Sequence, residues 1–327
     1  MKLESITVEN YRQFEKAELA FDEGITILAG ANNSGKTSLI NLIKNIFVDD
    51  KLNYNMSDIP AKNMREWVEW VYPIFQKFFR DGKTEENVEK DLLNVVIPKE
   101  ETESSQGLGY SNMIYIHLQL KEYEKNIDPL KVNMFFLEEP ESHMHPQMQQ
   151  VFIKYLLDYY ESKLQGLITT HSNEMVRVAG ISHLRVIRHV GNFKSELYDL
   201  SILVKDLKKP EEMEDKELAN FFDWFFEIGY SEIVFADRAI FYEGDTERLF
   251  IRKAMTLEEY KKLKQQYVAF IQVGGAYAKN YEKLIRLLGI KSLIITDIDY
   301  GKSEIVIEDI KKSKTTNATI EYFYSIL

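Results

Sequence analysis

A glycine-containing loop between a predicted strand and a predicted helix constrains this chain more than any other feature. Residues 30–37 read GANNSGKT, which matches the full pattern G-x-x-x-x-G-K-[ST]. The apolar run 25–29 before the loop predicts a buried parallel strand, and the apolar spacing over 36–47 predicts an amphipathic helix. A strand, this loop and a helix in that order predict a phosphate-binding cradle within an α/β fold.

Each residue type in the loop has a physical role toward a triphosphate. Gly30 and Gly35 let the backbone curl so that its N–H groups face the phosphates. Lys36 is expected to reach the β- and γ-phosphates, and Thr37 to offer its hydroxyl to Mg²⁺. A chance glycine turn is the alternative, which the flanking strand and helix disfavour. We therefore expect ATP as a cofactor, contacted by Asn32, Asn33, Ser34, Gly35, Lys36, Thr37 and Ser38.

An acidic strand end supplies the second half of the predicted nucleotide site. The apolar run 132–137 is followed by Glu138 and Glu139. Ligands of open α/β folds bind beyond the carboxyl ends of the strands. We therefore predict that Glu138 holds the Mg²⁺-bound water, and that the catalytic Glu139 orients or deprotonates the attacking water. The strand predicted at 166–170 ends just before His171, where this residue is expected to sense the γ-phosphate.

A second group of acids follows two further predicted strands, 239–242 and 292–296: Glu243, Glu247, Asp297 and Asp299. The period of two along a strand points Asp297 and Asp299 to the same side. Carboxylates gathered at one sheet edge are electrostatically untenable unless cations neutralise them. Mg²⁺ or Mn²⁺ are the natural occupants, and two such ions can clamp a phosphodiester. The alternative for each acid pair taken alone is a solvated strand end.

The order of predicted elements divides the chain into two α/β units. A charge-rich stretch at 205–220 is the best candidate for a boundary. Beyond it, predicted strands alternate with helices at 245–264 and 277–288, which indicates a small parallel sheet. The predicted domains are an ATPase domain over 1–205, with a missing or shortened insertion around 48–106, a boundary over 206–238, and a second, C-terminally incomplete domain over 239–327.

Composition limits the class of protein. Zero cysteines exclude disulfides and thiolate metal sites and favour a reducing cytoplasm. A formal net charge of −11 argues against coating nucleic acid by bulk charge. Local lysine runs near 261–264 and 311–314 are candidate phosphate contacts, or alternatively solvated helix faces. No segment approaches the roughly 20 apolar residues of a membrane helix, so we expect no membrane partner.

The first constellation resembles the ABC ATPases of the RecF, SMC and OLD group. The resemblance lies in the phosphate loop, the strand ending in Glu-Glu-Pro-Glu, the sequence SHMHPQ at 142–147, and His171. It implies that two ATPase heads pair, each completing the other's site with a signature loop, for which 104–112 is the candidate. His143 and His145 allow two interpretations, zinc ligands or packing residues of the loop after the catalytic acid.

The second constellation, E-G-x-x-E followed by D-x-D, resembles the Toprim domain of topoisomerases, primases and OLD-family nucleases. The resemblance implies that Glu243 and Glu247 ligate one metal ion, and that Asp297 and Asp299 ligate metal or its water network. Glu243, Asp297 and Asp299 would be catalytic. Glu321 is a plausible later metal ligand, and no lysine can be assigned.

An ABC head followed by a Toprim domain is the order found in OLD (overcoming lysogenization defect) nucleases, including Gabija-type and retron-associated anti-phage effectors. The resemblance implies an ATP-hydrolysing DNA endonuclease whose head regulates metal-dependent cleavage. The implied partners are double-stranded DNA, a homodimer or higher homo-oligomer through the heads, and a defence-system protein or RNA–protein complex. The alternative is a RecF/SMC-like DNA-repair ATPase or sensor whose Toprim-like part binds DNA or a partner without cutting.

Overall fold

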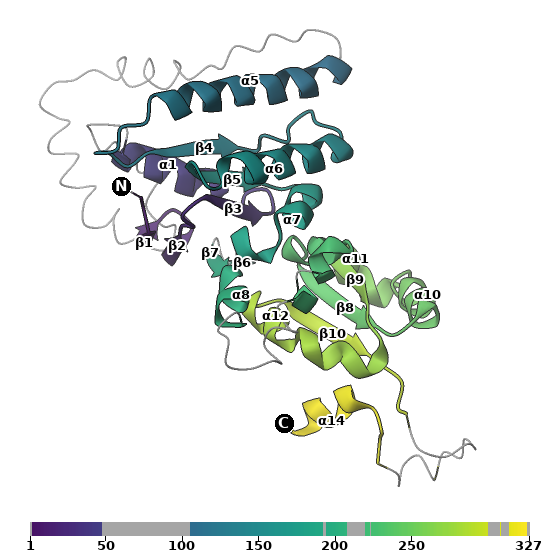
Figure 1. Ribbon diagram of the computed structural model, residues 1–327. Helices are drawn as coiled ribbons and strands as arrows, with labels where there is room; N and C mark the ends of the chain where they lie inside the picture. Colours follow the sequence, from purple (N-terminus) through teal and green to yellow (C-terminus); the bar gives the residue numbers. More distant parts are fainter. Residues whose placement is uncertain are drawn as a thin grey trace, which may run out of the picture.

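The structure is a computed structural model that describes residues 2–47, 105–191, 194–207, 220–222, 224–299, 308 and 314–325 (Figure 1). The insertion predicted around 48–106 lies outside the described residues as far as residue 104, and so do Lys311 and Lys312. Among the described helices, none is long and apolar enough to cross a membrane.

A five-stranded sheet forms the core of the N-terminal part, in the order β4-β5-β3-β6-β7. The first four strands are parallel, and β7 runs antiparallel to β6. Their bounds are Ile25–Gly30 for β3, Met134–Glu138 for β4, Gln165–Thr170 for β5, Leu184–Gly191 for β6 and Lys194–Asp199 for β7. Every residue of β3 and β5 is buried, as expected for central strands of a covered parallel sheet. The ends of β3, β4 and β5 therefore meet at one edge.

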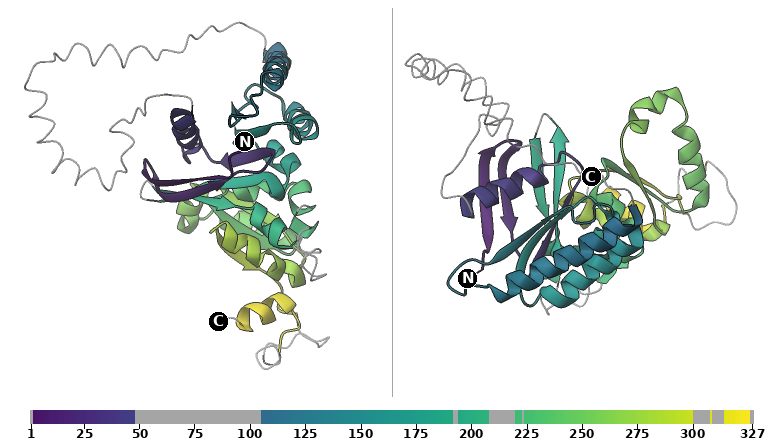
Figure 2. Two further views of the ribbon diagram at one scale, coloured as in Figure 1. Left: turned by 60° about the vertical axis from the view of Figure 1, so that its left-hand side comes forward. Right: turned by 90° about the horizontal axis from the view of Figure 1, so that it is seen from above.

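Two hydrophobic layers cover the faces of this sheet. Because strand side chains alternate between faces, Ile27 and Ala29 join one core and Leu28 joins the other. Figure 2 shows α5 and α6 side by side over the sheet. Helix α1 shares its hydrophobic core with a two-stranded hairpin formed by β1 and β2. The elements are β1 (Ser5–Tyr11), β2 (Phe14–Ala20), α1 (Lys36–Phe47), α5 (Ser105–Lys125), α6 (Pro146–Tyr160), α7 (Asn173–Ala179) and α8 (Ser201–Leu207).

The C-terminal part is built on a three-stranded parallel sheet in the order β10-β8-β9. Strand β10 pairs with β8 so that Ile295 lies opposite Tyr242, which places the next residues, Thr296 and Glu243, side by side. The elements are β8 (Arg238–Tyr242), α10 (Asp245–Ala254), α11 (Lys261–Lys264), β9 (Val268–Gln272), α12 (Glu282–Leu287), β10 (Lys291–Ile295) and α14 (Ala318–Ser325). The expected α/β fold class with parallel sheets is confirmed.

The two parts share one hydrophobic core. Phe222, Phe225 and Phe226 are fully buried and belong to the same cluster as Val176 of α7 and Phe241 of β8. These three phenylalanines of the predicted boundary are therefore packed in the shared core, whereas Trp224 and Ile228 beside them are exposed. A short 3-10 helix, η3 (Tyr230–Val234), leads from this aromatic segment into β8.

Several predicted elements differ from the observed ones. The helix predicted over 245–264 is broken, because α10 ends at Ala254 and the Thr256 hydroxyl donates to the carbonyl of Lys253. The helix predicted at 277–288 begins as a 3-10 turn, η5 (Gly275–Tyr281), before α12. The candidate signature loop 104–112 is helical from Ser105 onward.

Candidate functional site

The glycine loop between β3 and α1 has two positions where a side chain would not fit. A Cβ at Gly30 would lie 2.6 Å from the carbonyl oxygen of Ile187 on the neighbouring strand. Gly35 has a φ of +110°, and a Cβ there would lie 2.6 Å from the ring of Phe14. Both glycines are therefore required by the backbone geometry, as the sequence pattern predicted.

The loop lines a cavity of about 430 Å³, within the range of roughly 300–1,000 Å³ typical of ligand pockets. All of the residues predicted to contact the nucleotide line it. The lining residues are Gln13, Asn32, Asn33, Ser34, Gly35, Lys36, Thr37, Ser38 and Glu139. Gln13, in the turn between β1 and β2, was not predicted from the sequence. Its amide donates to the carbonyl of Asn33 at 3.3 Å. In the same turn, Arg12 donates to the Ser38 hydroxyl at 3.1 Å.

Lys36 lies over its own loop. Its Nζ donates to the carbonyl oxygens of Gly30 at 2.9 Å and Ala31 at 3.2 Å, and the side chain is 5% exposed. Burial lowers the pKa of Lys36, and the negative charge of Glu139 opposes that shift. Among the described residues, this buried ammonium contacts two carbonyls and one carboxylate, and its positive charge is suited to bind an anion such as a phosphate.

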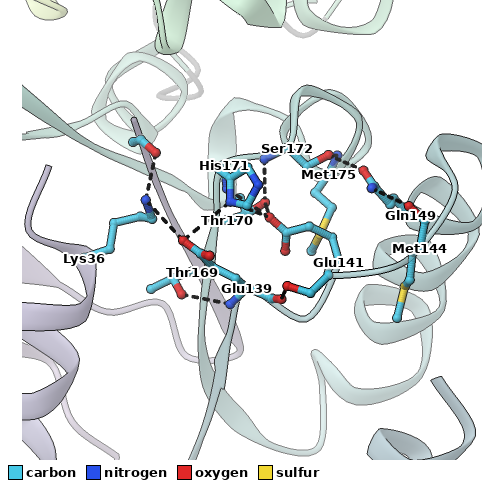
Figure 3. A network of polar contacts seen from close by, with 12 residues as sticks. Lys36, Glu139, Glu141, Met144, Gln149, Thr169, Thr170, His171, Ser172 and Met175 are labelled. Carbon is cyan, nitrogen blue, oxygen red and sulfur yellow. Dashed lines mark hydrogen bonds and ion pairs between the residues drawn. The ribbon is translucent and has the colours of Figure 1, made fainter. Parts of the chain in front are cut away.

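Glu139 lies between Lys36 and His171, two other residues predicted to act at the nucleotide site (Figure 3). Its Oε1 is 3.6 Å from Lys36 Nζ and 3.5 Å from His171 Nδ1. The Glu139 N–H donates to the carbonyl of Thr169 at 3.1 Å, which fixes the residue beyond the end of β4 at a φ of +44°. The parallel register that pairs Glu138 with Thr169 brings these strand ends together. The predicted convergence of Lys36, Glu139 and His171 is therefore present.

Glu141 holds the His171 segment in place, a role that the sequence analysis did not assign. The carboxylate is 3% exposed, and its Oε1 accepts from the Thr170 hydroxyl at 2.6 Å and the His171 N–H at 3.0 Å. Its Oε2 has no hydrogen-bond partner among the described residues. The third acid of the Glu-Glu-Pro-Glu sequence was the available signal, since a buried carboxylate requires donors.

Ser172 extends this network to α6 and α7. It donates to Gln149 Oε1 at 2.5 Å and caps α7 by accepting from the Glu174 and Met175 N–H groups. Gln149 in turn donates to the carbonyl of Met144 at 2.8 Å. The loop after β4 and the segment after β5 are thus joined by hydrogen bonds. A shift of His171 would therefore displace groups that contact α6 and α7.

The side chains of His143 and His145 do not pack into the core. Both side chains are exposed, and His145 precedes the first turn of α6. Within the described part of the chain, no group of three His, Cys, Asp or Glu side chains is arranged to hold a metal ion.

The acids of the second constellation lie at adjoining strand ends. Glu243 Oε2 accepts from the Thr296 hydroxyl and from the Asp297 N–H, each at 3.2 Å. Glu247 Oε2 accepts from the Gly244 N–H at 2.9 Å, which folds the first turn of α10 back toward β8. The predicted proximity of Glu243 to Asp297 is present.

The charge at these strand ends fits a divalent cation. The pKa of Asp297 is raised, chiefly by the negative charge of Glu243, with further contributions from desolvation, Glu247 and Asp299. Such mutual repulsion is what a bound cation relieves, and oxygen ligands suit Mg²⁺ or Mn²⁺. The crowding of negative charge is what indicates a cation site, because the described carboxylates do not form a coordination sphere.

A residue that the sequence analysis did not single out, Asn317, reaches the same strand end. Its amide donates to the Thr296 hydroxyl at 2.9 Å, the Asp297 carbonyl at 3.1 Å and Asp299 Oδ2 at 3.2 Å. Glu321, the later acid named from the sequence, is exposed in the first turn of α14.

Two of the three lysines of α11 make local contacts. Lys264 Nζ donates to the carbonyl of Thr256 at 2.9 Å, and Lys261 lies 3.6 Å from Glu258. These contacts favour a solvated helix face over a dedicated phosphate track.

Comparison with family models matches both parts of the chain. The model of the AAA ATPase domain matches residues 1–97 and 48–176, which together span more than half of the sequence. The model described as "Overcoming lysogenization defect protein-like, TOPRIM domain" matches residues 234–299. The second match contains Glu243, Glu247, Asp297 and Asp299, and the expected order of an ATPase followed by an OLD-like TOPRIM domain is confirmed.

Similar proteins include endonucleases. The chain is 30% identical over 281 residues to "Endonuclease GajA" of Bacillus cereus (strain HuB5-5), covering 76% of this chain and 40% of that relative. It is 33% identical over 109 residues to "Septu protein PtuA" of Bacillus thuringiensis, covering 30% of this chain and 27% of that protein. The chain thus spans less than half the length of these relatives.

Among solved structures, the SMC head domain from Thermotoga maritima is similar at 14% identity with a TM-score of 0.38, covering 61% of this chain and 99% of that one. An ATPase domain and a TOPRIM domain imply the use of a nucleotide and a divalent metal ion. With a phosphate loop, an acidic strand end and a matching family model over the same residues, this chain belongs to the AAA ATPase domain family and carries an OLD-like TOPRIM domain after it.

Proposed function

We propose that this chain binds and hydrolyses ATP at the glycine loop and cleaves DNA at the acidic strand ends of its TOPRIM domain, under the control of the ATPase head. The observation that supports cleavage is the proximity of Glu243 and Asp297 at neighbouring strand ends, where their negative charges repel. The proposed domains remain 1–205 and 239–327, with 206–238 between them.

At the nucleotide site, we assign a role to each side chain. Lys36 binds the phosphates through the ammonium group that now contacts the carbonyls of its own loop. Thr37 and Glu138 hold Mg²⁺, whose charge offsets the charge that develops on the phosphates. Glu139 positions or deprotonates the attacking water, and His171, 3.5 Å from Glu139, senses the γ-phosphate.

At the TOPRIM site, four carboxylates hold Mg²⁺ or Mn²⁺: Glu243, Glu247, Asp297 and Asp299. Glu321 is a further candidate ligand. The metal, when bound, stabilises the attacking and leaving oxygens of the phosphodiester. The contact from the Asp297 N–H to Glu243 keeps the two strand ends in one register. The carboxylates attract the cation, and the β8–β10 pairing keeps them together.

Similarity to a protein named as an endonuclease supports a nuclease over a purely DNA-binding ATPase. Accordingly we propose double-stranded DNA as the substrate, a homodimer or higher homo-oligomer through the heads, and a role in anti-phage defence. A defence-system protein or an RNA–protein complex would be a further partner.

A plasmid assay tests the proposal. The chain is incubated with supercoiled plasmid and Mg²⁺ or Mn²⁺, with and without ATP, and nicked and linear products are quantified. Nicking that is lost in Asp297→Ala, while ATP hydrolysis is retained, supports the TOPRIM site. No cleavage with either metal, in a protein that still hydrolyses ATP, would favour a repair-type ATPase or sensor.

A further inference from the structure

The chain returns to the acidic strand end after β10, at the N-terminus of α14. The Thr316 N–H donates to the carbonyl of Asp299 at 2.8 Å, and the Thr315 hydroxyl donates to the same carbonyl at 3.2 Å. The next residue, Asn317, is 1% exposed. This short segment therefore packs directly against the loop that carries Asp297 and Asp299.

The Asn317 side chain makes two kinds of contact. Its Oδ1 accepts from the Thr319 and Ile320 N–H groups at 3.0 and 3.3 Å, which caps α14. Its Nδ2 points the other way, to the Thr296 hydroxyl, the Asp297 carbonyl and Asp299 Oδ2. An amide has two N–H groups, so three acceptors within 3.2 Å leave no donor idle. One buried side chain thus joins the helix to the acid loop.

The chemistry of an amide suits this position. The charged groups that act on Asp297 are all acids: Glu243, Glu247 and Asp299. A lysine in place of Asn317 would cancel part of the negative charge that attracts a cation, and an aspartate would add to the repulsion. A neutral donor fixes the direction of the Asp299 carboxylate and leaves its charge intact. Groups that orient ligands in this way typically contribute ~10- to 100-fold to metal affinity.

We propose that Asn317 is a positioning residue for the metal-binding acids, holding the Asp299 carboxylate and the Asp297 backbone in the orientation that a divalent cation requires. This inference rests on the proposed function, because it takes the acidic strand ends to be a metal site. Asn317 is not a catalytic residue, since its contacts are to the ligands and not to the substrate.

The first test measures Mn²⁺ binding to the nucleotide-free chain by titration calorimetry, without DNA. Asn317→Ser keeps an oxygen that caps a helix well but removes both amide donors. We expect Mn²⁺ to bind about 10-fold more weakly or worse, with ATP hydrolysis unchanged. Wild-type Mn²⁺ affinity in Asn317→Ser would overturn the role of Asn317. Glu243→Gln separates the two proposals: if it binds Mn²⁺ as wild type does, the metal site itself is absent and the proposed function fails.

The second test uses Asn317→Asp, because aspartate has the size of asparagine and keeps the capping oxygen. This test applies even if Asn317→Ser does not fold. The change places a second carboxylate against Asp299, where the amide now donates. We expect a lower melting temperature than wild type in a chelator, and a larger rise on adding Mn²⁺. An unchanged melting temperature in the chelator would mean that Nδ2 does not make the contact on which the proposal depends.

Discussion

Arg188 on β6 donates from Nη2 to the carbonyl oxygen of Ala236 at 2.7 Å, and so joins the ATPase sheet to the residues that enter β8 of the TOPRIM sheet. The residue before it, Ile187, pairs with Gly30 at the start of the glycine loop. A second contact runs from the Ser231 hydroxyl to the carbonyl of Asn173, in the first turn of α7 after His171. Both halves of the nucleotide site are thus linked to the segment that leads to Glu243.

Replacing Arg188 should loosen this connection. Arg188→Met leaves the Ala236 carbonyl without its donor, which costs about 1–3 kcal/mol for a buried acceptor and lowers the melting temperature by several degrees. We expect ATP hydrolysis to persist while plasmid nicking loses its dependence on nucleotide. Arg286→Met, at an exposed arginine on α12, is the matched control. Wild-type stability together with wild-type nucleotide dependence would contradict the connection.

Lys36→Ala should abolish ATP binding. The ammonium group is the buried cation of the cavity, and a charge-assisted contact to phosphate cannot be replaced by a methyl group. Binding is measured by titration with a fluorescent ATP analogue. Lys44→Ala, in the last turn of the same helix, should bind as wild type does. Unaltered affinity in Lys36→Ala would refute the assignment of the phosphate loop.

Glu139→Gln should trap ATP and stabilise a dimer. The glutamine keeps the size of the side chain beside Lys36 and His171 but cannot take a proton from water. We expect hydrolysis to fall by about 100-fold or more and a dimer to appear in light scattering when ATP is added. The exposed Glu122→Gln on α5 serves as the control. Normal turnover in Glu139→Gln would place the water-activating base elsewhere.

The local part of the nucleotide site was predictable, because adjacent residues of one loop and the ends of parallel strands fix it. The helix at 36–47 and the meeting of Lys36, Glu139 and His171 follow from that pattern. The positions that escaped prediction depend on distant chain segments. Arg185 was not singled out from the sequence, yet it is fully buried and makes a bidentate pair with Asp22, 163 residues earlier in the chain.

The same distinction applies to the TOPRIM part. Glu243 and Asp297 could be placed together because the carboxyl ends of parallel strands in one sheet lie at the same edge. Asn317 could not, since it lies 20 residues beyond Asp297 and an asparagine before a helix predicts only a cap. Likewise the charged stretch before residue 220 suggested a linker, whereas Phe222 and Phe225 just beyond it are buried in the hydrophobic core that the two parts share.

Removing one charge from the acidic strand ends should stabilise the metal-free protein at neutral pH. The pKa of Asp297 is raised chiefly because the negative charge of Glu243 disfavours its ionised form. Folding is therefore penalised above that pKa, and the penalty declines as pH falls through it and is gone below the ordinary aspartate pKa. We expect Asp297→Asn to melt at a higher temperature than wild type in a chelator at pH 7, with the difference shrinking in acid. Asp158→Asn, on α6 and outside the acid cluster, should show no such pH-dependent gain. Added Mn²⁺ should reverse the order, because the wild type regains stability by binding the cation and the variant loses a ligand. If wild type and Asp297→Asn melt together at pH 7 in the chelator, the carboxylates do not repel one another enough to call for a metal ion.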